Sequence, residues 1–441
     1  MSSNVFLDHP YLLIAFVAFF INIPFGYIRE NCPKFSASWV FWIHASIPLL
    51  IYLRITLGTS TWFIPVSIFF AILGQVVGSR WRRKTRTQSD LEKLEQIPDL
   101  QIPSTGKFSV NDSEVAIVLL NMGGPETIQE VRPFLKRLFM DRRIIRFPLS
   151  SLLQGVFANL IVAARAKVTE HRYGLIGGGS PLLQSCIRQA NALQEALRQR
   201  SRNITTTICF NYSRPLPQEV VAQLKNAGKK VIVALSLYPH YSEATTGSNR
   251  YYLKKEVQRQ SPQTMVMEAK PYFLDDQYIT AFCDRILEQI QKGESLDDFY
   301  IVFSAHGLPL YYLTNGDPYP FQIAQTVCRV LDRLNRKDRW VISYQSAVGP
   351  FQWLKPSTDS IIKALADRHQ NKILIVPIAF VNDHIETICE IDIEYRAMAR
   401  NRGIVDFRMS RALECHPAFI SALADCVERT LNKPKELAVV N

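Results

Sequence analysis

The sequence predicts an α/β protein with two Rossmann-like lobes, a cleft between them, and three transmembrane helices ahead of both lobes. Beyond residue 112, apolar strand-like runs alternate with helix-length segments, which is typical of parallel sheets covered by helices. This region is too long for one small doubly wound unit, so two lobes are expected. Within the first 84 residues, three apolar runs contain almost no charge.

The expected strands are continuously apolar and rich in β-branched residues, as in sheets that are buried on both faces. They are Val115–Asn121, Thr205–Tyr212, Val231–Leu237, Phe299–Ala305, Trp340–Gln345 and Ile373–Phe380. The expected helices between them include Pro181–Gln199, Pro217–Ala227, Asp275–Lys292, Pro320–Leu334 and Thr358–Arg368. Each half opens on a strand that runs into a Gly/Pro turn, so the lobes are expected to be similar. We place lobe 1 at residues 112–272 and lobe 2 at residues 273–441.

Residues 1–84 are predicted to form a membrane domain with three spans. The runs Tyr11–Ile28, Trp39–Leu57 and Trp62–Gly78 are each close to the roughly 17–25 residues that cross a bilayer. The alternative is three buried core helices, but the runs show no amphipathic stripe. Five Lys/Arg follow in the segment Arg80–Arg86, which predicts that the N-terminus is outside and the rest of the chain is cytoplasmic. Residues 85–111 are polar and are predicted to be a linker.

Composition limits the other classes of function. The net charge of +12 is dispersed and no nucleic-acid-binding motif occurs, so no nucleic-acid partner is expected, while anionic small ligands or lipid remain candidates. The eight cysteines are scattered without a Cys-x-x-Cys pair, which argues against a structural zinc or iron–sulfur site. They are interpreted as reduced thiols of a cytoplasmic domain.

Three loop segments could contact a ligand, and two of them follow expected strands. Asn121-Met-Gly-Gly-Pro125 closes the first strand, and its glycines allow close approach of a ligand, although a plain turn is the simpler interpretation. Gly177-Gly-Gly-Ser-Pro181 is typical of a helix start that accepts anions, or of a flexible loop. Tyr238-Pro-His-Tyr-Ser242 suits a flat apolar ligand with carboxylates, or a capped turn.

One histidine and a row of carboxylates are expected to meet at the carboxyl edge of the second sheet. His306 ends one strand, and Asp383, Glu386 and Glu390 follow another strand with spacings of three and four residues, which predicts one helical face that Glu394 continues. Hard oxygen ligands beside a histidine suit a divalent cation and proton transfer. A buried core histidine and a solvated acidic face are the alternatives.

Taken together, these segments resemble the ferrochelatase family, which inserts ferrous iron into a porphyrin. The similar stretches run in family order over residues 115 to 430. They are Leu119–Glu126, Tyr173–Pro181, Thr245–Ser248, Phe303–His306, Asn315–Pro320, Tyr344–Pro350 with Trp353, and Val376–Phe380 through Asp383–Glu386 to Asp392–Tyr395.

The resemblance implies a chelatase-like fold of two lobes and a role for each matching residue. His306 would take pyrrole protons or bind the metal, and Glu386 would lie opposite it across the macrocycle. Asp383 and Glu390 would line an acidic route for the metal. The residues implied to pack against or orient the porphyrin are Met122, Ser180, Tyr212, Trp353, Phe380 and His384.

The expected function is therefore that of a protoporphyrin IX ferrochelatase at the inner face of a bacterial membrane. Its expected partners are porphyrin, ferrous iron and membrane lipid, and no cofactor beyond the substrate Fe²⁺ is expected. Animal relatives carry a C-terminal two-iron, two-sulfur cluster, but this tail has only Cys415 and Cys426. A coproporphyrin III enzyme is a rival, although Tyr often replaces Met122 in that branch. A nickel or cobalt chelatase and a non-catalytic haem-binding membrane protein are the others, and oligomeric state is not predicted.

Overall fold

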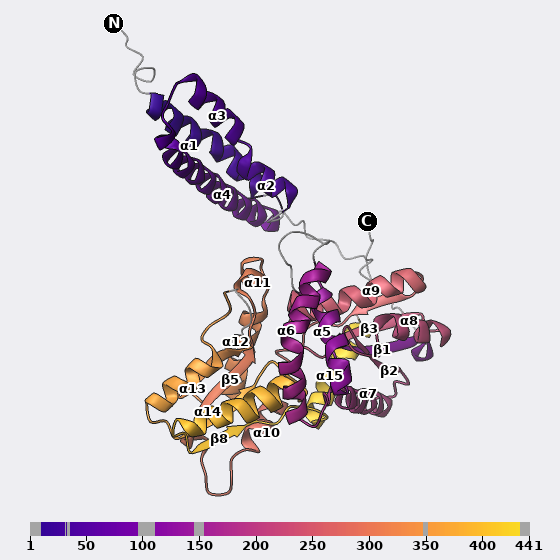
Figure 1. Cartoon of the computed structure of the whole chain (residues 1–441). Coiled ribbons are helices and arrows are strands. Elements are labelled where there is room, and N and C mark those ends of the chain that lie inside the picture. The colour runs from indigo at the N-terminus through magenta and orange to yellow at the C-terminus, as the bar shows by residue number, and fades with distance from the viewer. Residues whose placement is uncertain are drawn as a thin grey trace. The chain divides into compact units, whose positions relative to one another are not determined.

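The computed structural model describes residues 10–30, 32, 36–95, 111–144, 154–346 and 352–432 (Figure 1). The chain divides into two compact units. Unit 1 comprises Met1–Ser104 with Phe147–Gly155, and unit 2 comprises Thr105–Arg146 with Val156–Asn441.

Unit 1 consists of apolar helices: α1 (Pro10–Arg29), α2 (Ala37–His44), α3 (Ile47–Thr56) and α4 (Ile64–Glu95). Three segments are long and apolar enough to cross a membrane: Pro10–Arg29, Ser38–Thr56 and Thr61–Arg82. The second predicted run is interrupted between α2 and α3, where Pro48 occupies the first turn of α3 and cannot continue the hydrogen bonds of a preceding helix. Helix α4 continues through Glu95, so the predicted linker begins as helix, and residues 96–110 of it lie outside the described residues.

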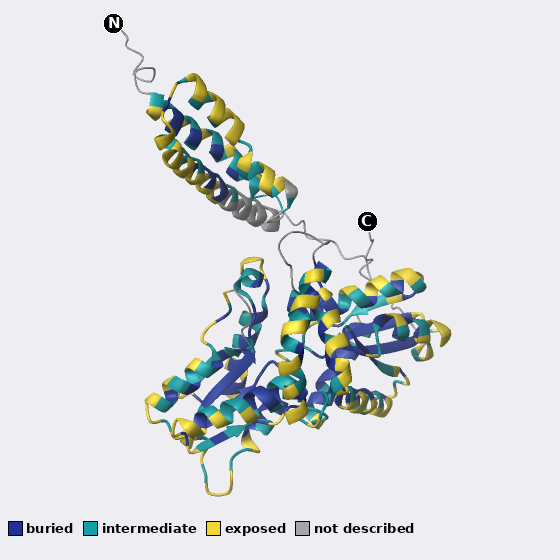
Figure 2. Ribbon diagram, viewed as in Figure 1, coloured by how far each residue is buried: buried dark blue, intermediate teal, exposed yellow. Residues whose placement is uncertain are grey.

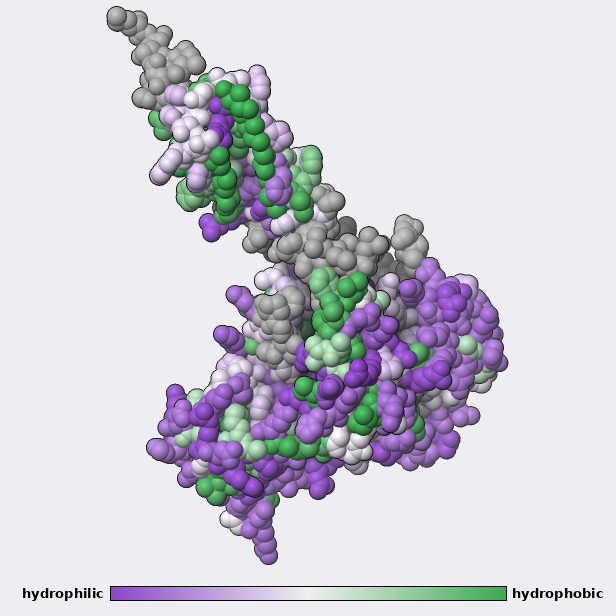
Figure 3. Space-filling model, in the orientation of Figure 1, coloured by the Kyte–Doolittle hydropathy of each residue, from purple (hydrophilic) through white to green (hydrophobic). Residues whose placement is uncertain are grey.

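The apolar side chains of unit 1 are largely exposed, which is not the pattern of buried core helices. Exposed fractions reach 88% at Trp62 and 74% at Ile55. Figures 2 and 3 show these exposed and hydrophobic residues along the helices of unit 1. The interpretation as helices that face lipid is therefore favoured over the core alternative.

Helices α1 and α4 are in close contact because glycines lie where they meet. A Cβ atom at Gly26 would stand 2.2 Å from the carbonyl oxygen of Gln75, and one at Gly78 would stand 1.9 Å from that of Ile23. Gly74 is equally close to Phe19. Small residues at such contacts let membrane helices pack backbone to backbone.

Unit 2 contains two parallel four-stranded sheets, which confirms the predicted fold. The first is formed by β1 (Val115–Asn121), β2 (Thr205–Phe210), β3 (Val231–Ser236) and β4 (Met265–Glu268) in the order β2-β1-β3-β4. The second is formed by β5 (Tyr300–His306), β6 (Trp340–Gln345), β7 (Lys372–Pro377) and β8 (Asp406–Met409) in the order β6-β5-β7-β8. The two orders are equivalent, so the similar openings of the two halves reflect a repeated topology.

Helices flank both sheets (Figure 1). Their bounds are α5 Val131–Met140, α6 Gln154–Leu175, α7 Leu182–Gln199, α8 Pro217–Asn226, α9 Ser248–Gln260, α10 Asp276–Leu287, α11 Leu310–Thr314, α12 Tyr319–Arg333, α13 Thr358–Asp367, α14 Arg396–Asn401 and α15 Pro417–Leu431. A π-helix follows the third strand of each sheet: η4 (Glu243–Gly247) after β3 and η6 (Glu386–Tyr395) after β7. π-Helical turns are rare and occur frequently at functional sites.

Helix α15, the last helix, packs against lobe 1, although the sequence analysis assigned it to lobe 2. Residues 273–441 were predicted to be lobe 2, whereas α15 packs against α7 and contacts β3 and β4 of lobe 1. Helix α10 packs against both α15 and α12. The two lobes are therefore joined through a shared layer of helices, and they are not consecutive along the chain.

Candidate active site

His306 and Glu386 form a direct hydrogen bond at the carboxyl edge of the second sheet. Five of the seven residues of β5 are buried, and the strand ends on His306, while Glu386 is the first residue of η6. Because β5 and β7 are adjacent and parallel, the chain leaves both strands at the same edge. The His306 Nδ1 to Glu386 Oε2 distance is 2.9 Å. The structure thus pairs the two residues that were predicted to be catalytic. The implied placement of Glu386 opposite His306 across a macrocycle is wrong, because a direct hydrogen bond of 2.9 Å leaves no room for a macrocycle between the two side chains.

The pair is strongly coupled electrostatically. Burial alone would lower the pKa of His306, but the Glu386 carboxylate outweighs it and raises that pKa. Burial would raise the pKa of Glu386, but His306 lowers it to about 2. An ionised Glu386 accepts the hydrogen bond, so Nδ1 of neutral His306 carries the proton and Nε2 keeps a free lone pair. Nε2 is therefore the atom that can take a proton or bind a metal.

Glu390 lies one turn along η6 and is held by three hydrogen bonds. Its oxygens accept from the Ser346 amide at 3.1 Å, the Ser346 hydroxyl at 2.8 Å and the Tyr395 hydroxyl at 2.7 Å. Burial first, and then the charge of Glu386, raise the pKa of Glu390. A carboxyl group with a raised pKa can exchange protons closer to neutral pH than an exposed one.

The predicted single helical face of carboxylates is not formed, because the segment is a π-helix that begins only at Glu386. Asp383 precedes it and accepts from the Thr387 hydroxyl at 3.0 Å, and its own amide donates to Glu414. Burial first, and then Glu414, raise the pKa of Asp383. Glu394 is paired with Arg172 of α6 at 2.7 Å. The charges of Glu386 and Glu390 thus raise the pKa of His306. Asp383 and Glu394 interact with other residues instead.

Aromatic side chains surround the pair within lobe 2. The Phe380 ring lies 4.4 Å from the His384 ring and 6.4 Å from the His306 ring, measured between centroids. His384 Nε2 is 3.9 Å from Glu386 Oε2, and burial lowers its pKa. Trp353 pairs through its backbone with Pro309 and packs on Gly307, directly after His306.

The predicted substrate residues of lobe 1 lie on neighbouring loops at the end of β1. Met122 donates its amide to the Asn121 side chain at 2.7 Å and accepts from the Tyr212 amide at 3.1 Å. The Ser180 amide donates to Pro125 at 2.7 Å, and a Cβ at Gly124 would stand 2.5 Å from its hydroxyl, so the two glycine loops pack together. Tyr212 is buried, and its hydroxyl donates to Asp141.

Four residues near the pair were not predicted as site residues. The Tyr319 hydroxyl donates to the His306 carbonyl at 3.2 Å, and the Gln345 side chain helps to lower the pKa of Glu386. Burial, and to a smaller extent Glu386, raise the pKa of Tyr173 and of Tyr238, so the Glu386 charge acts on lobe 1. Tyr238 donates to Asn121 beside Met122. All four lie in segments that the sequence analysis had singled out, but nothing distinguished them from their neighbours there.

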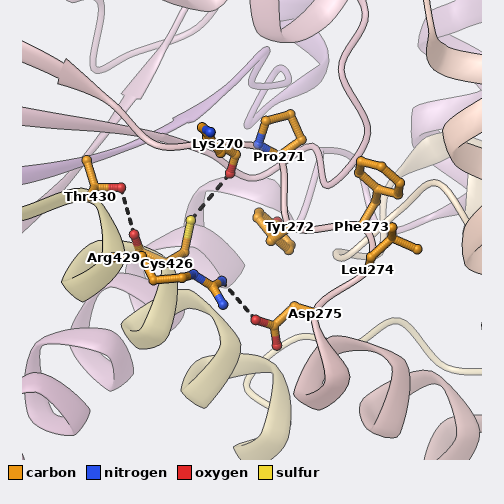
Figure 4. A pocket seen from close by; sticks show the side chains of 9 residues that line it. All are labelled: Lys270, Pro271, Tyr272, Phe273, Leu274, Asp275, Cys426, Arg429 and Thr430. Carbon is orange, nitrogen blue, oxygen red and sulfur yellow. Dashed lines mark hydrogen bonds and ion pairs between the residues drawn. The ribbon is translucent and has the colours of Figure 1, made fainter. Parts of the chain in front are cut away.

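No group of three or more His, Cys, Asp or Glu side chains suited to hold a metal occurs in the described part of the chain. A separate hollow of about 460 Å³ lies between the segment 270–275 and α15, and Figure 4 shows its lining. Arg429 pairs there with Asp275 at 2.8 Å. None of the predicted site residues lines this hollow.

Comparison with known proteins identifies the family of the chain. A ferrochelatase family model matches residues 114–431. The protein named ferrochelatase in Parasynechococcus marenigrum is 40% identical over 334 residues, covering 73% of this chain and 84% of the relative. The one in Synechococcus elongatus is 38% identical over 325 residues, with the same coverage. A solved structure of SirB from Bacillus subtilis with Fe³⁺ is similar with a TM-score of 0.44 and 13% identity, covering 72% of this chain and 96% of that one.

The family model and the two ferrochelatase relatives define the protein as a metal chelatase. More particularly, the chain belongs to the ferrochelatase family, whose members insert a metal into porphyrin in haem biosynthesis. The family match begins at residue 114, so helices α1 to α4 lie outside it.

Proposed function

We propose that this chain inserts Fe²⁺ into protoporphyrin IX and forms protohaem with release of two protons. The observation that carries the proposal is the 2.9 Å contact between His306 Nδ1 and Glu386. Because this contact uses Nδ1, Nε2 of His306 is left to accept a proton. The Glu386 carboxylate would then stabilise the imidazolium that forms when Nε2 is protonated. Each pyrrole proton would pass to Nε2 and then toward Glu386 and Glu390, of which Glu390 has the raised pKa.

A site with few protein ligands suits a metal ion that is a substrate, because the ion has to leave the protein for the porphyrin. Two protein ligands, His306 and Glu386, would hold the ion weakly, and the porphyrin nitrogens would complete its coordination as the protons leave. A closed site with four protein ligands would retain the ion. Glu390 would supply a further oxygen on the way in, and Asp383 would contribute from the start of η6, where its neighbours are Thr387 and Glu414.

The porphyrin would rest against Met122, Ser180 and Tyr212 on lobe 1 and against aromatic rings on lobe 2. Phe380 packs against His306 and His384, and Trp353 lies against Gly307, so a macrocycle between the lobes would meet rigid aromatic surfaces that can bend it. Met122, where the coproporphyrin branch often has tyrosine, supports protoporphyrin as the substrate.

Substrate choice is tested by anaerobic insertion of ferrous iron by the purified chain. We expect protoporphyrin IX to be metallated with a higher kcat/KM than coproporphyrin III. A preference for coproporphyrin III would reassign the substrate. Binding of porphyrin or haem without insertion under any of these conditions would favour the non-catalytic alternative.

The proposed enzyme is an integral membrane protein with its chelatase unit on the cytoplasmic side. The support is the set of three segments long enough to cross a membrane and the basic run Arg80–Arg86 that follows them. Lipid is therefore a partner of unit 1, and porphyrin and iron are the partners of unit 2.

The proposed enzyme needs no iron–sulfur cluster. None of the eight cysteines forms a disulfide, and the two nearest the C-terminus are Cys415, which is half-buried, and Cys426, which is buried. Four thiolates at suitable spacing are needed to hold such a cluster. We expect purified protein to lack the visible absorbance of an iron–sulfur centre, and stoichiometric iron with acid-labile sulfide would overturn this expectation.

A further inference from the structure

Unit 1 contains a buried polar cluster that joins all of its helical segments. The Asn22 side-chain oxygen accepts from the Ser46 hydroxyl and from the Gln75 amide, each at 3.1 Å. The Gln75 amide also donates to the Trp42 carbonyl at 2.9 Å. Asn22, Ser46 and Gln75 are at most 5% exposed. Such groups are expensive in hydrocarbon unless paired, so this cluster fixes one register of the helices.

The same cluster holds one arginine in a defined orientation. Arg29, the last residue of α1, donates to Gln75 Oε1 at 2.7 Å and to the Ser79 hydroxyl at 2.8 Å. Its guanidinium lies 5.7 Å from the centre of the Trp39 ring. Both acceptors are neutral, so they orient the guanidinium without cancelling its charge.

No carboxylate forms an ion pair with Arg29 within the part of the chain that the structure describes, and its Nε–H is buried without a partner. A half-buried cation normally has a nearby counter-charge, because desolvation disfavours its charged form. Two of the five N–H groups are used by Gln75 and Ser79. The guanidinium is therefore preorganised for an anion that the described residues do not provide.

Further cationic and aromatic side chains gather at the same end of the unit. Helices α1 and α4 run in the same direction, since Phe19 meets Gly74 and Ile23 meets Gly78. Arg82 lies over the Tyr27 ring at 5.2 Å, and Tyr27 contacts Trp81 edge to face. Aromatic rings and arginines at one end of membrane helices mark the level of the lipid headgroups.

We propose that Arg29, presented by Gln75 and Ser79, binds the phosphate of an anionic phospholipid. This inference rests on the proposed membrane location of unit 1. A guanidinium fork matches the oxygens of a phosphate, and anionic lipid is abundant on the cytoplasmic face where the basic run Arg80–Arg86 is expected to lie. The bound lipid supplies the missing counter-charge and ties the end of α1 to the headgroup layer.

The test is lipid retention by the full chain. Protein is inserted into vesicles of phosphatidylcholine with phosphatidylglycerol, extracted in mild detergent and examined by native mass spectrometry. We expect retention of phosphatidylglycerol by the wild type, and a loss of at least about 10-fold in Arg29→Gln, as expected when a charge-assisted fork is removed. The matched control is Arg54→Gln, since Arg54 lies in the last turn of α3 near the opposite end of the unit, and its retention should equal that of the wild type.

Two more conservative variants test the proposal if the Arg29→Gln protein does not insert into the vesicles. Arg29→Lys keeps the charge without the fork, and Ser79→Ala removes one of the two acceptors, so both should reduce retention in part. Equal retention in wild type, Arg29→Lys and Ser79→Ala would overturn the site.

Competition separates the sources of the anion. Inorganic phosphate at millimolar concentration should not displace the lipid, because it lacks the acyl chains. Displacement by protoporphyrin at equal concentration would overturn the lipid assignment in favour of porphyrin carboxylates. Removal of the wild-type chain from vesicles by alkaline carbonate would refute the proposed membrane location. A chain that stays in the membrane but shows no selectivity for phosphatidylglycerol would refute only the inference about Arg29.

Discussion

Replacing His306 by alanine is expected to reduce iron insertion by about 10²–10⁴-fold, the range contributed by one positioned general base. The variant should still bind porphyrin, because Phe380 and Trp353 pack around the site independently of the imidazole. The measurement is the initial rate of anaerobic ferrous insertion together with porphyrin binding by fluorescence quenching. His171→Ala is the control, since His171 is exposed on α6 and should leave the rate unchanged.

The partner substitution, Glu386→Gln, should have a similarly large effect for a different reason. Glutamine preserves the size of the side chain but removes the charge that raises the pKa of His306 and stabilises its protonated form. The matched control is Glu394→Gln on the same π-helix, whose carboxylate is occupied by Arg172. Near-normal turnover in either His306→Ala or Glu386→Gln would refute the catalytic assignment, and equal loss in Glu394→Gln would show that the charge of the whole helix matters.

The central strands could be predicted from sequence because each is a continuous apolar run. β1 is buried throughout, and β5 and β7 are buried except at one or both ends, so burial on both faces left a clear signal. β4 and β8 were missed because they have only four residues each and are mostly half-exposed, with Glu268 and Arg408 among them. Edge strands of this kind lack an apolar run. They form because β4 pairs with β3 and β8 pairs with β7 through backbone hydrogen bonds.

The sequence predicted that His306 and the acidic segment would meet, but not the local geometry of that segment. Spacings of three and four residues implied an α-helical face, and nothing in the segment Glu386–Tyr395 signals a π-helix. Asp383 received its metal role from the spacing together with the family resemblance, and Glu394 was expected only to continue the same helical face. Their partners, Glu414 and Arg172, are far away in sequence, and only the folded chain brings them together. Long-range pairing of this kind leaves no local pattern to detect.

A chain cut just before Ser109 should be soluble, in contrast to the full chain. Unit 1 supplies all three segments that could cross a membrane, and unit 2 begins at Thr105, so the cut removes the apolar helices and leaves β1 intact. The full chain should remain in the membrane pellet after alkaline carbonate, and the truncated chain should appear in the supernatant without detergent. Extraction of the full chain by carbonate would contradict the membrane assignment.

The truncated chain should also keep its chemistry, because every predicted catalytic and substrate residue lies beyond position 120. With porphyrin dissolved in detergent, its kcat should match that of the full chain within about twofold, since no group acting in the transition state has been removed. With porphyrin in liposomes its KM should rise, because protoporphyrin is apolar and partitions into lipid, and the tether that keeps the enzyme at the lipid surface is gone. A truncated chain that folds but is inactive in both assays would show that α1 to α4 take part in the reaction itself. A KM that is unchanged in liposomes would show that the anchor does not assist substrate capture.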